Sequence, residues 1–146
     1  MLIGWLRTPR VRLAAQVTGA LAALAERFAI PVIPYLPRHM CLPSDHPMLL
    51  DYDSGPYVGA ADAILVLDCD VPWIPSLGGP AAGAKIIHMG ADPLYRSYPV
   101  RGFPCDLAIT AASAIALPAL AEAMTAGASE TPIAAHRQRV AAMRAE

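Results

Sequence analysis

The chain has 146 residues, of which 55% are hydrophobic and 16% are charged, and its formal net charge is −1. This length and hydrophobicity are enough to bury the core of one domain, so the composition excludes an intrinsically disordered protein. The small net charge gives no electrostatic reason to expect a nucleic acid or an anionic membrane as a partner. No apolar run approaches the roughly 20 residues that cross a bilayer.

The three cysteines, Cys41, Cys69 and Cys105, lie far apart and form no CxxC pair. Reduced thiols in a cytoplasmic protein explain this pattern better than disulfides or a zinc site. We therefore expect a cytoplasmic location, with the cysteines acting as small packing residues.

The first 35 residues predict a strand, a helix and a second strand. Apolar residues 2–6 begin the first strand, and Val11–Phe28 has apolar residues at helical spacing. Residues 30–35 carry prolines at both ends, which favours a short strand or one at the sheet margin. The first strand starts almost at residue 1, so we expect the chain to be a piece of a longer protein.

Arg7 belongs to a basic cluster, with Arg10 and Arg12, close to the start of this helix. Cations there oppose the helix dipole, so they could await an anion such as a phosphate. The alternative is a solvated basic turn.

Residues 36–53 contain three prolines and predict a long irregular segment, either a functional loop or an interface covering. Two histidines and an aspartate in it could bind a metal, although no regular element sets their spacing, and structural roles are the alternative. These residues are His39, Asp45 and His46. A short helix is expected over residues 55–61, with Ser54 as its N-cap.

The strongest strand signal is Ala63–Leu67, an apolar run without alternation that predicts a strand buried on both faces. Asp68 and Asp70 follow it directly, and ligands of open α/β sheets bind at the carboxyl ends of strands. This Asp-x-Asp pattern could hold a metal and a nucleotide-sugar, or simply cap loop amides. Trp73 could stack on a ring, or it could plug the core beneath a loop.

The rest of the chain adds two strands and a helix. Strands are predicted over residues 84–89 and 106–110, with Gly90 and Asp92 after the first of them. Ser113–Ala126 predicts a helix that Gly127 ends, although Pro118 would fit best if the helix began near Leu117. Residues 130–146 are charged and form either a terminal helix or a linker. This order of elements predicts an α/β fold with a parallel sheet and right-handed crossovers.

Several segments together resemble one family. They are LAERFAIPV at 24–32, LPSDHP at 42–47, AADAILVL at 60–67, AKIIHMGADP at 84–93 and DLAI at 106–109. In this order and spacing they are similar to the central domain of thiamine-diphosphate-dependent enzymes of the acetolactate synthase and benzoylformate decarboxylase type. The similarity covers about residues 2–126.

The resemblance implies a three-layer, Rossmann-like fold of the DHS-like NAD/FAD-binding type, with a parallel sheet of about five to six strands. Residues 1–127 would be the central domain, and residues 128–146 a linker or helix toward a diphosphate-binding domain. Thiamine diphosphate and magnesium would be bound by the flanking pyrimidine-binding and diphosphate-binding domains of the parent decarboxylase or carboligase. The chain alone would not be catalytic, and the parent would be a homo-oligomer.

Some members of this family bind the ADP part of FAD, ADP or CoA in the central domain, but this chain departs from their pattern. Gly90 stands where flavin-binding members carry an acid, and residues 50–55 replace a GMHG loop. Asp68 and Asp70 would repel a diphosphate. We therefore expect an empty or repurposed nucleotide crevice rather than bound FAD. Its candidate residues are Gly4, Arg7, Asp68, Asp70, Trp73, Gly90 and Asp92.

Two other functions stay open. One is a stand-alone regulatory module that binds an adenine nucleotide. The other is a small metal-dependent enzyme that uses Asp68, Asp70 and His46.

Overall fold

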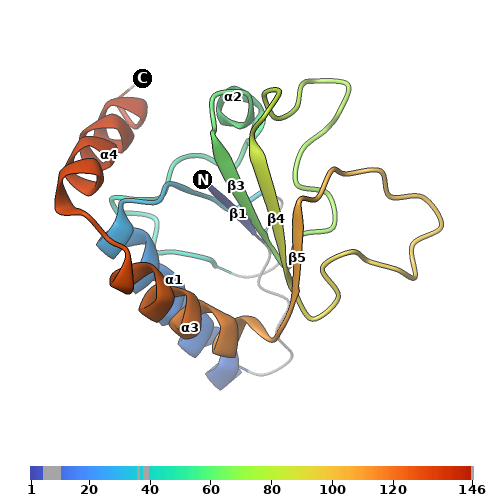
Figure 1. Ribbon diagram of the computed structural model, residues 1–146, viewed down its shortest axis with the longest axis horizontal. Helices are drawn as coiled ribbons and strands as arrows, with labels where there is room; N and C mark the ends of the chain where they lie inside the picture. Colours follow the sequence, from blue (N-terminus) through green and yellow to red (C-terminus); the bar gives the residue numbers. More distant parts are fainter. Residues whose placement is uncertain (5–10, 36, 38–39, 146) are drawn as a thin grey trace.

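The computed structural model describes residues 1–4, 11–35, 37 and 40–145, and it confirms an α/β fold with a parallel, five-stranded sheet (Figure 1). The spatial order of the strands is β2-β1-β3-β4-β5, and every neighbouring pair is parallel. The strands are β1 (Leu2–Gly4), β2 (Val32–Ile33), β3 (Ala63–Leu67), β4 (Lys85–Gly90) and β5 (Leu107–Thr110).

The β2 side of the sheet carries one more parallel contact. Leu49 forms an isolated bridge to Val32, whose N–H donates to the Met48 carbonyl at 2.8 Å. If this bridge is counted as a strand position, the spatial order becomes 3-2-1-4-5-6, the order of doubly wound nucleotide-binding sheets. The strand expected over residues 30–35 is shorter in the structure because Pro31 and Pro34, which have no N–H, flank Val32–Ile33.

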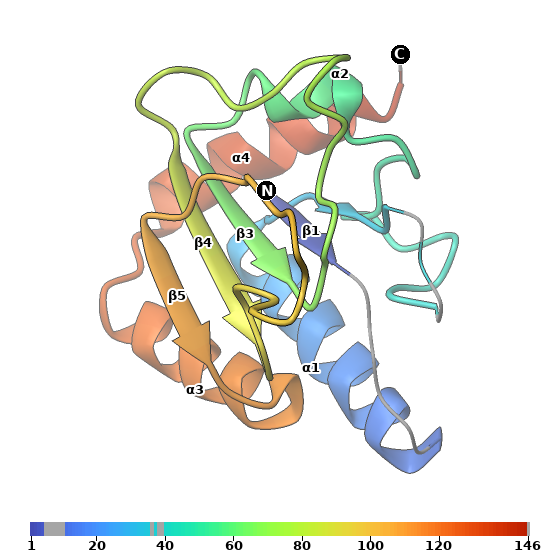
Figure 2. The ribbon, with the colours of Figure 1, turned by 90° about the vertical axis from the view of Figure 1, so that its right-hand side faces the viewer.

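The sheet lies between two unequal layers (Figures 1 and 2). Helices α1 (Val11–Phe28) and α3 (Ser113–Ala126) cover one face, and α4 (Glu130–Met143) lies on the same side. The short helix α2 (Gly55–Val58) and the long loops after β3 and β4 lie on the other side. None of the helices in the described part of the chain combines the length and apolar character that a membrane span needs.

The alternation of side chains along the strands divides the core in two. Ile64 and Val66 of β3 point to the loop side, where they pack in one buried cluster with Ile86. Leu67 points to the helix side, where it packs in a second cluster with Leu21 of α1. Each fully buried side chain of this kind contributes about 1.5–3 kcal/mol, so both faces stabilise the sheet.

Helices α2 and α3 begin at Gly55 and Ser113, as the sequence predicts, and the structure decides two details of these starts. Ser54 occupies the N-cap position of α2, but its buried hydroxyl donates to the Pro72 carbonyl at 3.0 Å rather than capping the helix. Helix α3 begins at Ser113 and not near Leu117, so Pro118 lies inside it. Pro118 lacks the N–H that an α-helix directs to the carbonyl four residues earlier. Pro118 lies on the exposed side of the helix.

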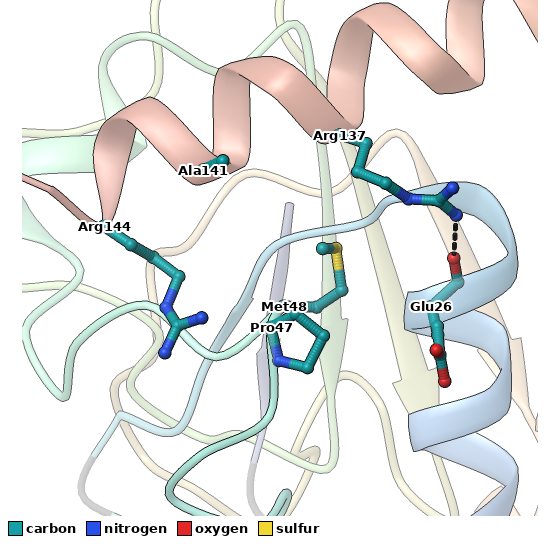
Figure 3. Close-up of a pocket in the computed structure, with 6 residues that line it drawn as sticks. All are labelled: Glu26, Pro47, Met48, Arg137, Ala141 and Arg144. Atoms are coloured by element: carbon teal, nitrogen blue, oxygen red, sulfur yellow. Dashed lines mark hydrogen bonds between the residues drawn. The ribbon is translucent and has the colours of Figure 1, made fainter.

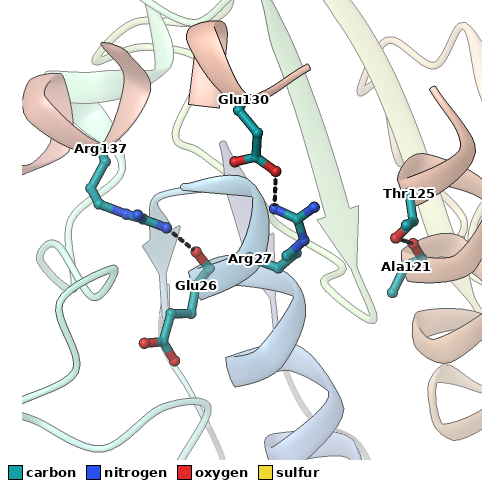
Figure 4. A network of polar contacts seen from close by, with 6 residues as sticks. All are labelled: Glu26, Arg27, Ala121, Thr125, Glu130 and Arg137. Atoms are coloured by element: carbon teal, nitrogen blue, oxygen red, sulfur yellow. Dashed lines mark hydrogen bonds and ion pairs between the residues drawn. The ribbon is translucent and has the colours of Figure 1, made fainter. Parts of the chain in front are cut away.

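Residues 130–143 form the helix α4, which docks on the end of α1 (Figure 4). Ile133 and Val140 are buried in the helix-side cluster. Arg137 donates to the Glu26 carbonyl at 2.8 Å, and Arg27 pairs with Glu130 at 2.9 Å (Figure 4). Exposed ion pairs contribute little to stability, so the two apolar side chains provide most of the attachment.

The docking of α4 can be tested with matched isoleucine substitutions. Ile133→Ala is expected to lower the free energy of unfolding by about 2–4 kcal/mol, because a buried side chain is lost. Ile115→Ala is the control: Ile115 also lies in a helix but is 73% exposed, so its loss is expected to change stability by less than about 0.5 kcal/mol. Urea unfolding measures both, and equal values would contradict the docked position of α4.

Candidate functional site

The carboxyl edge of the sheet brings together five of the residues that the sequence marked. Asp68 and Asp70 follow the end of β3, while Gly90 ends β4 and precedes Asp92 by two residues. Gly4 ends the neighbouring strand β1, where it pairs with Leu67. Arg7 lies outside the described residues. The strand order reverses between β1 and β3, which is the position where doubly wound sheets hold ligands.

Asp68 turns back into the protein rather than facing a ligand. It adopts a left-handed conformation with φ of 48°, which aspartate tolerates better than most residues. Its carboxylate accepts a hydrogen bond from the Ser113 hydroxyl at the first residue of α3. A carboxylate is favourable there because it faces the positive end of the helix dipole. Asp68 therefore occupies the helix N-terminus that a phosphate would need.

Gly90 is required by this arrangement. A Cβ added to Gly90 would clash with Oδ1 of Asp68. The two residues are held side by side because the Asp68 N–H donates to the Met89 carbonyl at 2.9 Å. A side chain at position 90 would therefore displace the Asp68 carboxylate from Ser113.

The other two acids of this edge also have partners within the chain. Tyr98 donates its hydroxyl to Oδ2 of Asp70 at 2.9 Å, and the N–H of Val71 donates to Oδ1 at 3.0 Å. Oδ1 of Asp92 lies 3.9 Å from Nε of Arg96, four residues later in the same loop. Both acids therefore order the loops that contain them.

Arg101 fastens the loop after β4 to the end of β3. Its Nε donates to the Asp70 carbonyl at 3.1 Å, and an Nη2 hydrogen points to the Cys69 carbonyl at 3.5 Å. The guanidinium lies 4.9 Å from the ring centre of Tyr95 and 5.3 Å from that of Phe103. Cation–π contacts of this kind are strongest where the cation is shielded from water, as here.

His88 completes this contact from the middle of β4. Nη2 of Arg101 lies 3.1 Å from Nδ1 of His88, and Nε2 lies 3.1 Å from the Pro104 carbonyl. A guanidinium can only donate, so Nδ1 accepts and Nε2 carries the proton. Burial lowers the pKa of His88, and the nearby Arg101 lowers it further. His88 is therefore a neutral structural residue.

The buried nucleophiles of this region are kept inert. Burial raises the pKa of Cys69 to about 12, and the nearby Asp70 carboxylate adds to the effect. Burial and the same carboxylate raise the pKa of Tyr95. The thiolate is the reactive form of cysteine, so Cys69 is not poised as a nucleophile.

Trp73 packs in the core. Its side chain is 3% exposed, and its ring meets Phe103 edge-to-face with ring centres 5.2 Å apart. In this position the indole packs beneath the loop after β3, in the loop-side core. It has no exposed face on which a ligand ring could stack.

The residues considered for a metal site do not converge. His46 lies beside the start of β2, where its Nδ1 accepts the Met48 N–H at 3.1 Å. Asp68 follows the opposite end of the sheet. His39 lies outside the described residues, and among those described no group of three or more His, Cys, Asp or Glu side chains is placed to hold a metal.

Sequence analysis missed the residues that organise this edge. Arg101, His88, Tyr98 and Ser113 had no assigned role, although a histidine inside an apolar strand is a signal for a buried polar partner. The partners themselves come from a loop and a helix distant in sequence, so their pairing had no local signature.

The described residues at this edge do not fit a diphosphate. The Asp68 carboxylate already occupies the start of α3, and Asp70 and Asp92 add negative charge. Of the cationic side chains described here, Arg101 is engaged with His88 and backbone carbonyls, and Arg96 is paired with Asp92. A bound diphosphate would therefore meet net repulsion.

No protein-family model matches the chain, and no curated protein is significantly similar to it.

The role of His88 predicts a pH-dependent stability. The folded pKa of His88 is lowered, so its contribution is complete above the unfolded value of about 6.5 and is lost as the pH falls below it. In His88→Gln, whose amide can make both hydrogen bonds, this loss between pH 7.5 and 5 is expected to disappear. Urea unfolding across this range measures it.

The control for His88 is His136→Gln, which alters an exposed histidine of α4 and is expected to keep the wild-type slope. An unchanged slope in His88→Gln would contradict the buried neutral histidine.

The contact between Gly90 and Asp68 predicts a cost for any side chain at position 90. Gly90→Ala is expected to lower the free energy of unfolding by about 1–3 kcal/mol, because the Asp68 carboxylate must leave Ser113. Gly102→Ala is the control, since an added Cβ there meets nothing within 4 Å. Thermal or urea unfolding distinguishes the two, and a neutral Gly90→Ala would rule out the close approach.

Proposed function

We propose that this chain is the central, non-catalytic domain of a thiamine-diphosphate-dependent decarboxylase or carboligase. In this role it supports the flanking pyrimidine-binding and diphosphate-binding domains of a cytoplasmic homo-oligomer. Those domains hold thiamine diphosphate and magnesium, and the central domain supplies a rigid spacer between them.

The observation that carries this proposal is the internal pairing of the carboxyl edge. The hydroxyls of Ser113 and Tyr98 donate hydrogen bonds to the carboxylates of Asp68 and Asp70. Arg101 donates hydrogen bonds to His88 and to backbone carbonyls. A catalytic edge needs polar groups that are free to meet a substrate. Groups that satisfy one another instead favour a structural domain.

The positions of the family-like segments give further support. AADAILVL at 60–67 contains β3, AKIIHMGADP at 84–93 contains β4, and DLAI at 106–109 begins β5. LAERFAIPV at 24–32 joins α1 to β2, and LPSDHP at 42–47 precedes the Leu49 bridge. The similar segments thus coincide with the elements of a sheet whose order, with the bridge included, is that of a Rossmann-like fold.

A second candidate is a stand-alone module that binds an adenine nucleotide. The reversal of strand order between β1 and β3 favours it, because nucleotides bind at this position in doubly wound sheets. Such a nucleotide would have to rely on residues 5–10, which include Arg7, rather than on the acidic side of the edge.

Titration calorimetry and thermal unfolding with ADP, FAD and CoA distinguish these functions. The structural-domain proposal expects no heat and no shift of the melting temperature. A nucleotide at one hundred times its dissociation constant would instead stabilise the fold by about 2.7 kcal/mol. Binding that is weakened in Arg7→Gln would favour the nucleotide module.

The size of the native polypeptide tests the domain proposal directly. An immunoblot of source cells against this domain is expected to detect a band several times larger than 15.4 kDa. A single band near 15.4 kDa would overturn the proposal that the domain works inside a larger enzyme.

A further inference from the structure

A pocket of about 440 Å³ opens at the other end of the sheet, far from the acidic carboxyl edge (Figure 3). It lies between the last turn of α1, the segment that precedes the Leu49 bridge, and one face of α4. Its volume falls in the range of pockets that hold small molecules. The residues that line it are Glu26, Pro47, Met48, Arg137, Ala141 and Arg144.

Two guanidinium groups reach this pocket from α4. Arg137 and Arg144 are seven residues apart, which places them on the same side of the helix, two turns from one another. Arg137 is anchored, because it donates to the Glu26 carbonyl at the end of α1. The side chain of Arg144 makes no hydrogen bond or ion pair within the described part of the chain. Arg144 is thus available to an external anion.

The wall between the charged groups is apolar. Figure 3 shows Pro47 and Met48 between Arg144 at one end and Glu26 at the other. Met48 is 3% exposed and its backbone carbonyl accepts the Val32 N–H, so it forms the fixed base of this wall, and the exposed Pro47 provides most of the apolar surface. An apolar wall beside a guanidinium that has no partner among the described residues suits a ligand with an anionic head and a short apolar body.

Glu26 limits the charge of such a ligand. Glu26 lies at the end of the pocket away from Arg144 (Figure 3), and the negative charge of its carboxylate would repel a second anionic group placed there. The charges therefore favour one anionic group, directed at Arg144, over two.

We propose that this pocket binds a small amphipathic anion, with a single carboxylate or phosphate on Arg144 and an apolar body against Pro47. Ile133 and Val140 hold α4 on the fold, and Arg137 adds its contact to the Glu26 carbonyl, so the site exists only while α4 is docked. This inference does not depend on the proposed function of the domain, because it concerns the opposite end of the sheet.

Titration calorimetry with hexanoate, hexyl phosphate, acetate and hexylamine tests the proposal on the whole chain. Hexanoate or hexyl phosphate is expected to bind, and the stronger of the two identifies the head group. Acetate is expected to bind at least about tenfold more weakly, since each buried CH₂ strengthens binding about threefold to fourfold. Hexylamine is expected not to bind.

Three variants locate the binding. Arg144→Gln is expected to weaken it about tenfold, the typical loss for a charged hydrogen bond. Ala141→Leu keeps the charge and a good helix former but fills the pocket, so it is expected to abolish binding. Arg139→Gln removes an exposed arginine of the same helix outside the pocket lining and is expected to leave binding unchanged.

Circular dichroism of each variant checks that α4 and the fold are intact. Equal weakening by Arg144→Gln and Arg139→Gln, unchanged binding in Ala141→Leu, or equal binding of hexylamine and hexanoate would overturn the proposal. So would the absence of binding by both hexyl anions. None of these results would alter the expected size of the native polypeptide, so the two proposals fail separately.

Discussion

The structure depends on the position of β3, a strand paired on both edges and covered on both faces. It pairs with β1 through three residues and with β4 through five. Because successive side chains of a strand point to opposite faces, Ile64 and Val66 are committed to one core and Leu67 to the other. Each core must then be closed by a different part of the chain. Long helices close one, and a short helix with two loops closes the other.

The loop-covered face explains why the polar groups of this protein are arranged as they are. Loops have no regular backbone hydrogen bonds of their own, so a buried loop needs side chains to satisfy it. Arg101 does this for the carbonyls of Cys69 and Asp70, and Ser54 does it for the carbonyl of Pro72. The acidic residues that follow β3 and β4, which are Asp68, Asp70 and Asp92, also interact with side chains of the same chain. The polar groups at the carboxyl edge of the sheet are thus used in contacts within the chain that hold the loops in place.

Local patterns were sufficient for the elements whose periodicity is strong. Val11–Phe28, Ala63–Leu67 and Ser113–Ala126 have the bounds expected from the sequence. Val11–Phe28 has apolar residues at helical spacing, whereas Ala63–Leu67 is identified as a strand by its short length and its flanking residues. The general rule for parallel sheets also placed Asp68 and Asp70 correctly at the carboxyl edge. The resemblance to a family suggested a sheet of five to six strands, and the structure has five strands and one bridge.

What the sequence could not provide was the pairing of distant groups. Asp68 and Ser113 are separated by 45 residues, and nothing near either of them indicates the other. Ser54 was a reasonable N-cap, yet a carbonyl from another loop competes for its hydroxyl. Leu49 has no strand-like neighbours, and its bridge exists because Val32 needs a partner on its outer side. Tertiary contacts of this kind override local preference.

The two edges of the sheet differ in how far their backbone groups are paired. This difference decides at which edge a further strand could be added. On the β2 side, the segment around Leu49 takes up the outward backbone groups of Val32 and closes that margin. On the β5 side, the strand is only four residues long and, among the residues that the structure describes, pairs only with β4, while Leu107 is 52% exposed. An uncovered strand with apolar side chains is a template for another strand. Any extension of the sheet, whether by an added segment of polypeptide or by unwanted aggregation, therefore begins at β5.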